Sequence, residues 1–208
     1  MKKAEDAASR LQSSQNKRQQ ILDAAYVVFS RKGFHRATVD EIIALADTGK
    51  GTVYNYFVNK ERLFYTLIQE RSAPFEARLR SICVAEADPL RKIHILTREF
   101  LRFYSQNADL WRVLLHEMRA FGTVGYSAFT PEQQEKYRKI FEEILAVLQS
   151  VIREGVEKRV LKPCNPKQAA YGLFSAIIAI VLQQLVGSDS DKAADNIANT
   201  FLFGIAER

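Results

Sequence analysis

The sequence predicts an all-α protein of about nine helices. Apolar residues recur at intervals of three and four along almost the whole chain, as in Leu22, Ala25 and Phe29, which is the spacing of one helix face. No window shows the alternation of apolar and polar residues, bounded by turn residues, that is typical of strands. Several segments also begin with a hydrogen-bonding cap residue followed by proline, a pair that favours a helix start.

A glycine and a capping box mark the first helix ends. Gly33 suits the left-handed residue that terminates a helix. Thr38 and Glu41 have the spacing of a capping box, in which each side chain bonds to the backbone N–H of the other residue. After residues 1–16, which we expect to form a flexible arm, the helices expected in this part of the chain cover residues 17–32, 38–46, 50–57, 60–83, 89–106 and 109–120.

Cap residues followed by proline mark the later helices. The pairs are Asp88-Pro89, Thr130-Pro131 and Asn165-Pro166. Proline is tolerated at the first helical position because the N–H group that it lacks has no partner there. Gly122 to Phe129 is the clearest loop, and the remaining helices are expected over residues 131–159, 166–186 and 191–206.

Two short helices near the N-terminus are separated by only three residues, Asp47, Thr48 and Gly49. A turn of this length makes the two helices cross steeply, as in the helix-turn-helix of DNA-binding proteins. Their apolar residues can then close a small core with the first helix: Val39, Ile42, Ile43, Val53 and Phe57 against Leu22, Ala25 and Phe29. This packing would leave a polar set available for contact, namely Lys50, Thr52, Tyr54, Asn55 and Tyr56.

These segments resemble the N-terminal domain of the TetR family of transcription regulators. The matching motifs are Gly33-Phe34, Thr38-Val39-Asp40-Glu41-Ile42, Lys50-Gly51-Thr52-Val53-Tyr54-Asn55-Tyr56-Phe57 and Lys60-Glu61. Residue type, order and spacing agree over roughly residues 17–64, which makes the resemblance specific. It implies a DNA-binding domain at residues 17–60 and an effector-binding and dimerisation domain at residues 61–208.

The resemblance also implies a role for each exposed residue of the second short helix. The residues nearest to the base edges would be Lys50, Thr52 and Asn55, and Gly51 would let the backbone approach the duplex closely. The phosphate contacts would come from Thr38, Tyr54, Tyr56 and Lys60. Lys60→Ala is then expected to lower the salt dependence of DNA binding by about one unit of slope. The capping box also explains Thr38 without DNA, and packing is an alternative role for the two tyrosines.

The turn departs from the family pattern, which usually reads Gly-Val-Ser where this chain has Asp47-Thr48-Gly49. The left-handed position then falls on Asp47, a residue type that tolerates this conformation better than most. Gly49 replaces the serine that would cap the next helix, a change worth roughly a few tenths of a kcal/mol. We expect the fold to tolerate both changes, and the extra carboxylate near the phosphates to lower affinity and shift base preference.

The second domain carries no specific motif, but helices 89–106 and 109–120 are rich in aromatic residues. This density suits a mostly apolar ligand cavity, and core packing is the alternative. The candidate ligand contacts are Phe100, Phe103, Tyr104, Trp111, Leu115, His116, Met118 and Phe121. His116 and Glu117 are adjacent and diverge by about 100° around a helix, so they do not form a chelating pair, and we expect no metal or cofactor.

Helix 166–186 is apolar over most of its circumference and contains small residues that permit close helix contact. Together with helix 191–206, it would build a four-helix interface between two identical chains. Burial within one chain is the alternative. The candidate interface residues are Gly172, Ala176, Ile177, Ile180 and Phe201.

Composition and charge agree with a regulator and disfavour other classes. The net charge is +6, and residues 1–60 carry ten Lys and Arg against six Asp and Glu, so the basic excess lies at the DNA-binding end. Two isolated cysteines indicate neither a zinc site nor a disulfide framework. No segment reaches the roughly 20 apolar residues of a membrane span, no secretory signal is present, and we expect a cytoplasmic protein. No catalytic constellation is visible, so an enzyme is not expected.

The resulting hypothesis is a dimeric repressor that reads a palindromic double-stranded DNA operator through two recognition helices, about 34–36 Å apart. An apolar or amphipathic small molecule would release it by favouring a conformation with the wrong helix spacing. The alternative from another class is a helical carrier of lipophilic ligands that binds no operator. An activator is also compatible with the sequence.

Overall fold

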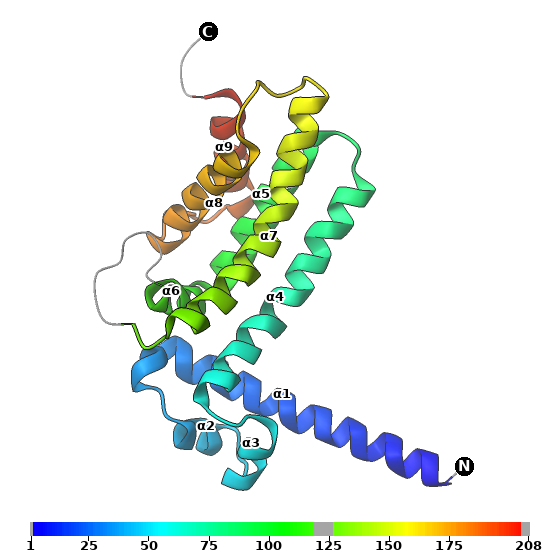
Figure 1. Ribbon diagram of the computed structural model, residues 1–208, viewed down its shortest axis with the longest axis vertical. Coiled ribbons are helices and arrows are strands. Elements are labelled where there is room, and N and C mark those ends of the chain that lie inside the picture. Colours follow the sequence, from blue (N-terminus) through cyan, green and yellow to red (C-terminus); the bar gives the residue numbers. More distant parts are fainter. Residues whose placement is uncertain (1, 119–126, 205–208) are drawn as a thin grey trace. The chain divides into compact units, whose positions relative to one another are not determined.

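The protein is all-α, as predicted. The computed structural model describes residues 2–118 and 127–204, with side chains from residue 14 onward, and these residues form nine helices and no strand (Figure 1). The helices are α1 (Lys2–Arg36), α2 (Val39–Leu45), α3 (Lys50–Tyr56), α4 (Lys60–Ala85), α5 (Pro89–Gln106), α6 (Ala108–Glu117), α7 (Pro131–Glu157), α8 (Pro166–Leu182) and α9 (Ser190–Phe203).

The predicted caps set the helix starts. The Thr38 N–H donates to Glu41 Oε2 at 3.2 Å and the Glu41 N–H donates to Thr38 Oγ1 at 3.3 Å, which completes the capping box. Asp88 and Asn165 each accept backbone N–H groups two or three residues ahead, with proline at the start of the helix. Thr130 forms a second capping box with Gln133. Each cap satisfies donors that have no partner inside the helix.

Several helix boundaries differ from the prediction, most clearly the start of α1 and the end of α8. The first helix begins at Lys2 rather than near residue 17, because residues 2–16 contain no glycine or proline and include the strong helix formers Ala4, Ala7 and Ala8. The mobility expected of residues 1–16 stays a prediction. The eighth helix ends at Leu182 rather than 186, since Gln184 adopts a left-handed conformation with φ 57°. The predicted end of the 109–120 helix and most of the predicted 122–129 loop lie outside the described residues.

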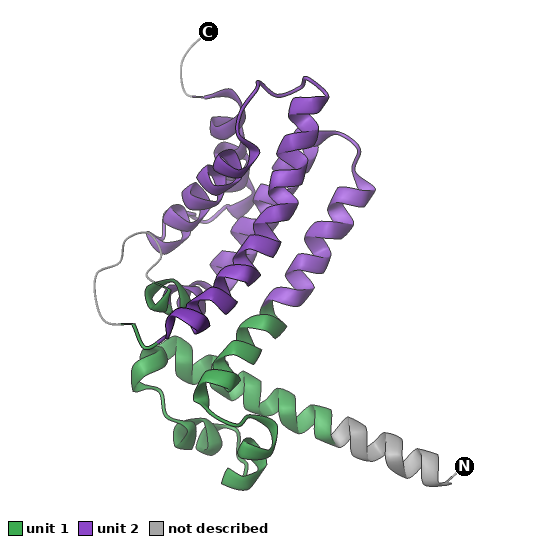
Figure 2. Cartoon of the chain, viewed as in Figure 1, with its two compact units in different colours: residues 1–71, 113–128 green, residues 72–112, 129–208 purple. Residues whose placement is uncertain are grey.

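The chain divides into two compact units, coloured separately in Figure 2. The first contains residues 1–71 and 113–128, and the second contains residues 72–112 and 129–208. Contacts thus group residues 61–71 and 113–128 with the N-terminal helices, whereas the functional boundary at residue 60 stays a prediction.

The core of the first unit joins α1 to the two short helices. Leu22, Ala25 and Phe29 are buried together with Ile42, Val53 and Phe57, as predicted, whereas Val39 and Ile43 are only half-buried. Phe29, Phe34 and Phe64 pack with ring centroids 4.8–5.8 Å apart. This aromatic packing fixes α4 against the end of α1.

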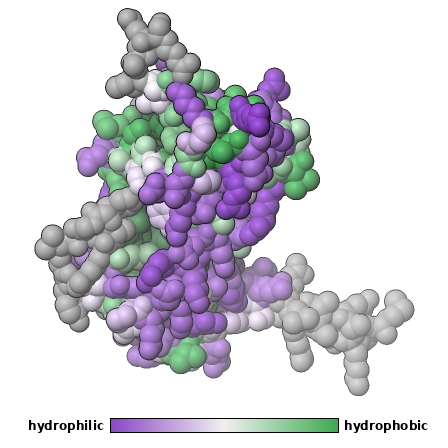
Figure 3. All heavy atoms as spheres, turned by 45° about the horizontal axis from the view of Figure 1, so that its top comes forward, coloured by the Kyte–Doolittle hydropathy of each residue, from purple (hydrophilic) through white to green (hydrophobic). Residues whose placement is uncertain are grey.

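The second unit is a helical bundle in which α5 packs against α7, α8 and α9. Arg98 of α5 pairs with Asp195 of α9 at 3.0 Å, and the nearly buried Lys92 of α5 pairs with Glu154 of α7 at 2.7 Å. In the space-filling view of Figure 3, hydrophobic residues reach the surface in the upper part of the picture. The core of the bundle is apolar, and the two ion pairs connect α5 to α7 and to α9.

Candidate nucleic-acid interface

The turn before α3 has the geometry that its residues predict. Asp47 adopts a left-handed conformation with φ 43°. Gly49 is the N-cap of α3 and provides no side-chain hydrogen bond, while its carbonyl accepts the Thr52 N–H at 3.0 Å. The turn thus places the start of α3 immediately after α2, without the usual cap.

Helix α3 is anchored by one face and presents the other to solvent. Val53 is buried, and so is Phe57, which follows the helix directly. The predicted contact residues lie on the remaining surface: Lys50, Gly51, Tyr54 and Asn55 are exposed, and Thr52 and Tyr56 are half-buried. The burial pattern therefore leaves a polar face with an ammonium, an amide and hydroxyl groups, which are the groups that read base edges and bind phosphates.

Lys50 has an acidic neighbour that the sequence did not reveal. Its Nζ lies 3.3 Å from Asp40 Oδ1, and both side chains are mostly exposed, at 66% and 75%. Exposed pairs of this kind contribute about 0–1 kcal/mol. The lysine therefore remains available for DNA, with Asp40 lowering the local positive charge.

Thr38 serves as a cap and is still exposed. The Lys32 ammonium and the Thr38 N–H bond to Glu41 and hold the pKa of this carboxyl below its usual value. In the capping box the Thr38 oxygen acts as an acceptor, so its own hydroxyl proton remains available as a donor. Capping and a phosphate contact are thus compatible in this residue.

Lys60 makes contacts within the chain that the sequence did not predict, and its phosphate contact stays a prediction. Its Nζ donates to the backbone carbonyls of Phe34 at 2.9 Å, Ala37 at 3.2 Å and His35 at 3.4 Å, and it lies 4.6 Å from the centre of the Phe34 ring. An ammonium has three donors, and all three are used here. Lys60 therefore closes the C-terminal end of α1, and the carbonyl bonds account for its charge without DNA.

The N-terminal part of α1 contacts the recognition helix, which sequence reasoning missed. Ser14 Oγ lies 2.8 Å from the Tyr56 hydroxyl, which also donates to the Ser14 carbonyl at 3.1 Å. Lys17 Nζ approaches the carbonyl of Asp47 at 3.5 Å. The lack of helix breakers before residue 17 was the available signal, because a continuous α1 brings this segment to α3.

The predicted ligand residues are distributed over both units. Phe100, Tyr104 and Trp111 are buried in the second unit and Phe103 is half-buried there. Leu115, His116 and Met118 belong by contact to the first unit, where His116 is exposed, and Phe121 lies outside the described residues. The structure therefore brings together four of the eight candidates in one aromatic region.

Two polar atoms in that region have no hydrogen-bond partner among the described residues: the Tyr104 hydroxyl and the Trp111 indole nitrogen. The two rings lie 5.1 Å apart. Burial raises the pKa of the Tyr104 hydroxyl well above its usual value, so it stays protonated. An unsatisfied buried donor costs about 1–3 kcal/mol, which makes this pair the clearest polar feature of the bundle interior.

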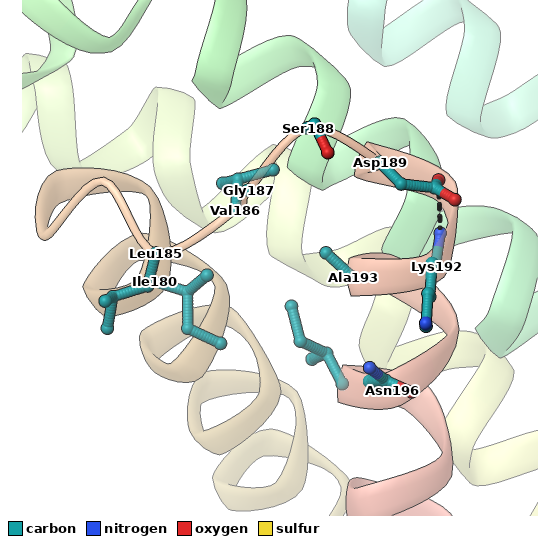
Figure 4. A pocket seen from close by; sticks show the side chains of 10 residues that line it. Ile180, Leu185, Val186, Gly187, Ser188, Asp189, Lys192, Ala193 and Asn196 are labelled. Atoms are coloured by element: carbon teal, nitrogen blue, oxygen red, sulfur yellow. Dashed lines mark hydrogen bonds between the residues drawn. The ribbon is translucent and has the colours of Figure 1, made fainter.

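An apolar face is formed by α8 and α9. Gly172 and Ala176 are exposed, and Ile180 and Phe201 are half-buried. All four line a groove of about 390 Å³. Beyond Ile180, a second hollow is lined by Leu185 and by residues of the α8–α9 connection, where Asp189 accepts the Lys192 N–H at 3.0 Å (Figure 4). Ile177, in contrast, is fully buried inside the chain, on the side of α8 that faces the bundle core, so nothing in the structure supports its predicted place at the interface.

The end of α6 contacts the end of α1 within the first unit. Glu117 is 3% exposed, and its Oε1 lies 3.9 Å from His35 Nε2 and 3.7 Å from His116 Nδ1. Its Oε2 accepts the Ala128 N–H at 2.7 Å. Among the described residues, no three His, Cys, Asp or Glu side chains are grouped to hold a metal ion.

None of the helices in residues 2–118 and 127–204 combines the length and the apolar character needed to cross a bilayer.

Known proteins match both parts of the chain. Residues 21–66 match the profile of bacterial regulatory proteins of the tetR family, and residues 86–182 match that of the tetracyclin repressor-like C-terminal domain. The HTH-type transcriptional regulator YhgD of Bacillus subtilis is 30% identical over 175 residues, which cover 77% of this chain and 80% of that protein. The fatty acid metabolism regulator protein of the same organism is 26% identical over 143 residues, covering 69% and 70% of the two chains.

Solved structures share the fold over nearly the whole length. The fatty acid degradation regulator FadR of Bacillus halodurans superposes with a TM-score of 0.79 at 26% identity, covering 92% of this chain and 97% of that one. FadR of Bacillus subtilis, solved in complex with stearoyl-CoA, gives a TM-score of 0.78 at 23% identity, covering 90% and 99%. The matched family consists of DNA-binding transcription regulators rather than enzymes, and its helix-turn-helix profile covers the α2–α3 region described above. The chain belongs to the TetR family of bacterial transcription regulators.

Proposed function

We propose that this protein is a homodimeric repressor that binds a palindromic operator through α3 and leaves it when an acyl compound binds to its C-terminal bundle. One observation carries the proposal: Val53 and Phe57 anchor α3, while its polar residues remain exposed. The exposed set provides the chemistry of direct readout, since a lysine can pair with guanine and an asparagine with adenine in the major groove.

The groove between α8 and α9 supports the dimer. It combines the exposed small residues Gly172 and Ala176 with the half-buried Ile180 and Phe201. Small residues permit close helix contact, and a two-fold axis through this face would present the same surface from both chains. Two recognition helices related by that axis would read two equivalent half-sites.

The effector class is supported by the relatives and by the bundle interior. The similar proteins include regulators of fatty acid metabolism, one of them solved with stearoyl-CoA, and the second unit contains a buried aromatic region around Tyr104 and Trp111. For release, the effector must bind the form that is incompetent for DNA more tightly, since equal affinity for both forms would change nothing.

Selection from a random double-stranded DNA library with the full chain tests the proposal. We expect enrichment of two inverted half-sites about 10 base pairs apart between centres. Asn55→Ala is expected to weaken operator binding by about 1–3 kcal/mol and to relax the base preference at one position of each half-site. Stearoyl-CoA is expected to release the selected fragment. Binding of stearoyl-CoA without any selected sequence would instead identify a lipophilic-ligand carrier.

A further inference from the structure

Seven aromatic side chains form one cluster inside the second unit. The aromatic cluster consists of Phe75, Phe100, Phe103, Tyr104, Trp111, Phe141 and Phe174. The helices α4, α5, α6, α7 and α8 each contribute to it. The Phe75 and Phe103 rings stack with centroids 4.0 Å apart. Tyr104 lies 5.4 Å from Phe174, and Trp111 lies 5.5 Å from Phe141.

Two members of the aromatic cluster stand out among the buried polar groups of this unit. Thr97 and Asn107 donate to backbone carbonyls at 2.7 and 2.9 Å, and Lys92 is paired with Glu154. The Nε atom of Arg98 also lacks a hydrogen bond, but its guanidinium is paired with Asp195. The Tyr104 hydroxyl and the Trp111 indole N–H, at 0% and 1% exposure, have no such partner among the described residues.

The chemistry of these two groups restricts what can satisfy them. The indole N–H is a donor only, and the phenol is also a donor when it meets an acceptor. Both are neutral, and the other members of the aromatic cluster are hydrocarbon rings. A carboxylate placed among them would lose its water without gaining a cation, which is strongly unfavourable. A neutral acceptor oxygen on an apolar molecule is the complement that fits.

We infer that Tyr104 and Trp111 recognise the carbonyl oxygen of the acyl effector, whose hydrocarbon part packs on the surrounding rings. The inference rests on the proposed function and adds to it a basis for specificity. The protein should distinguish a neutral acyl thioester from a molecule of the same length without the carbonyl. The selectivity arises because only the carbonyl satisfies two buried donors that have no hydrogen bond to the described residues.

The test compares stearoyl-CoA with S-octadecyl-CoA, a thioether that lacks the carbonyl oxygen. Trp111 is the single tryptophan of the chain, so its fluorescence reports binding directly. We expect the intact protein to prefer the thioester about tenfold, equivalent to 1.4 kcal/mol. Tyr104→Phe is expected to lose most of this preference while binding the thioether unchanged. Trp111→Phe, followed by calorimetry, is expected to behave in the same way.

A matched control is Tyr137→Phe, which changes another buried tyrosine of the same unit. Tyr137 stacks on Phe129 at 4.8 Å and lies outside the aromatic cluster. We expect this variant to keep the tenfold preference. Thermal unfolding of the ligand-free Tyr104→Phe protein is expected at or above the temperature of the original protein, because an unbonded buried hydroxyl has been removed.

Four results overturn the inference, and they separate it from the proposed function. If Tyr104→Phe lowers the affinities for both ligands equally, the residue contributes only packing. A preference that survives in both Tyr104→Phe and Trp111→Phe would assign the carbonyl to other groups. If the intact protein selects an operator but binds neither CoA compound, the acyl effector is excluded and the inference is excluded with it. Binding of both compounds with equal affinity removes only the inference.

Discussion

The ammonium group of Lys60 bonds to three carbonyls at the end of α1, whereas Lys50 is 66% exposed on α3. We therefore expect Lys60→Ala to destabilise the protein by about 1–3 kcal/mol and to leave the salt slope of operator binding unchanged. Lys50→Ala is expected to lower that slope by about 1 with unchanged stability. Chemical unfolding and binding titrations in salt measure both effects. The reverse pattern would return the phosphate contact to Lys60.

Glu154 of α7 gives a prediction on pH. Hydrogen bonds from Lys158 and Lys92 hold the pKa of Glu154 below its ordinary value of 4.5. A carboxyl whose pKa is lower in the folded state than in the unfolded state stabilises the fold at pH values above its unfolded-state pKa. This stabilisation is lost as the pH falls through the folded-state pKa. Glu154→Gln should therefore lower the free energy of unfolding by about 1–2 kcal/mol at pH 7, a value between those of exposed and buried ion pairs. The cost should shrink below pH 4.5.

Thermal unfolding between pH 3 and pH 8 checks this dependence. Glu157→Gln is the matched control, because Glu157 is exposed on the same helix. A loss of stability at pH 7 that persists at pH 3 would contradict the assignment to the ionised carboxylate.

Single residues were predictable where their role is local. The capping box of Thr38 and the left-handed Asp47 depend on neighbours within four residues, and both were confirmed. The carbonyl contacts of Lys60 were not predictable from the motif, because its partners lie 23 to 26 residues away. Its role depends on how α4 packs against α1, which a motif does not record.

Among the elements, the α2–α3 turn separates conformation from charge. Asp47→Gly is expected to gain about 0.5–1 kcal/mol of stability, since glycine adopts positive φ freely. Gly49→Ser is expected to add roughly a few tenths of a kcal/mol through a new cap. Asp47→Gly and Asp47→Asn should both raise operator affinity by removing a carboxylate, but only the glycine should raise stability markedly. Unequal affinities for these two variants would point to the shape of the turn instead.

The α8–α9 face yields the prediction on assembly. Ala176 is exposed in the groove, so Ala176→Arg is expected to convert a dimer into a monomer and to weaken operator binding at least about 100-fold, since the two half-sites are then bound independently. Light scattering and binding titrations measure both. Ala146→Arg, at an exposed position of α7, is the matched control. A monomeric original protein, or a dimeric Ala176→Arg protein, would place the interface elsewhere.

Helix positions were largely predictable because caps and apolar spacing are local signals. The errors occur where the chain leaves or continues a helix for other reasons: α8 stops at a left-handed Gln184, and α1 continues to Lys2 through residues that favour helix. Ile177, which the sequence places at the interface, lies on the buried side of α8. An all-round apolar helix does not reveal which side meets its own bundle.

At the scale of the whole molecule, α6 is one continuous helix whose residues fall in both compact units. Its first part belongs to the second unit and carries Trp111 of the aromatic cluster, and its last part belongs to the first unit. There, Glu117 lies 3.9 Å from His35 at the end of α1. An effector bound at Trp111, as inferred above, would act on the same helix that carries Glu117, and we therefore predict coupling between effector binding and operator binding.

The His35 contact should carry part of this coupling. In the original protein, stearoyl-CoA is expected to weaken operator binding by a factor within the usual range of about 5 to 150. His35→Gln should reduce that factor at least about fivefold, while the separate affinities for operator and stearoyl-CoA stay within about twofold. His116→Gln is the matched control: His116 also lies beside Glu117, at 3.7 Å, but on the same helix, so its loss should leave the coupling intact. Because coupling is reciprocal, the effect of operator on stearoyl-CoA affinity should fall by the same factor. If His35→Gln weakens operator binding but leaves the coupling between stearoyl-CoA and operator unchanged, the contact between His35 and Glu117 has only a structural role.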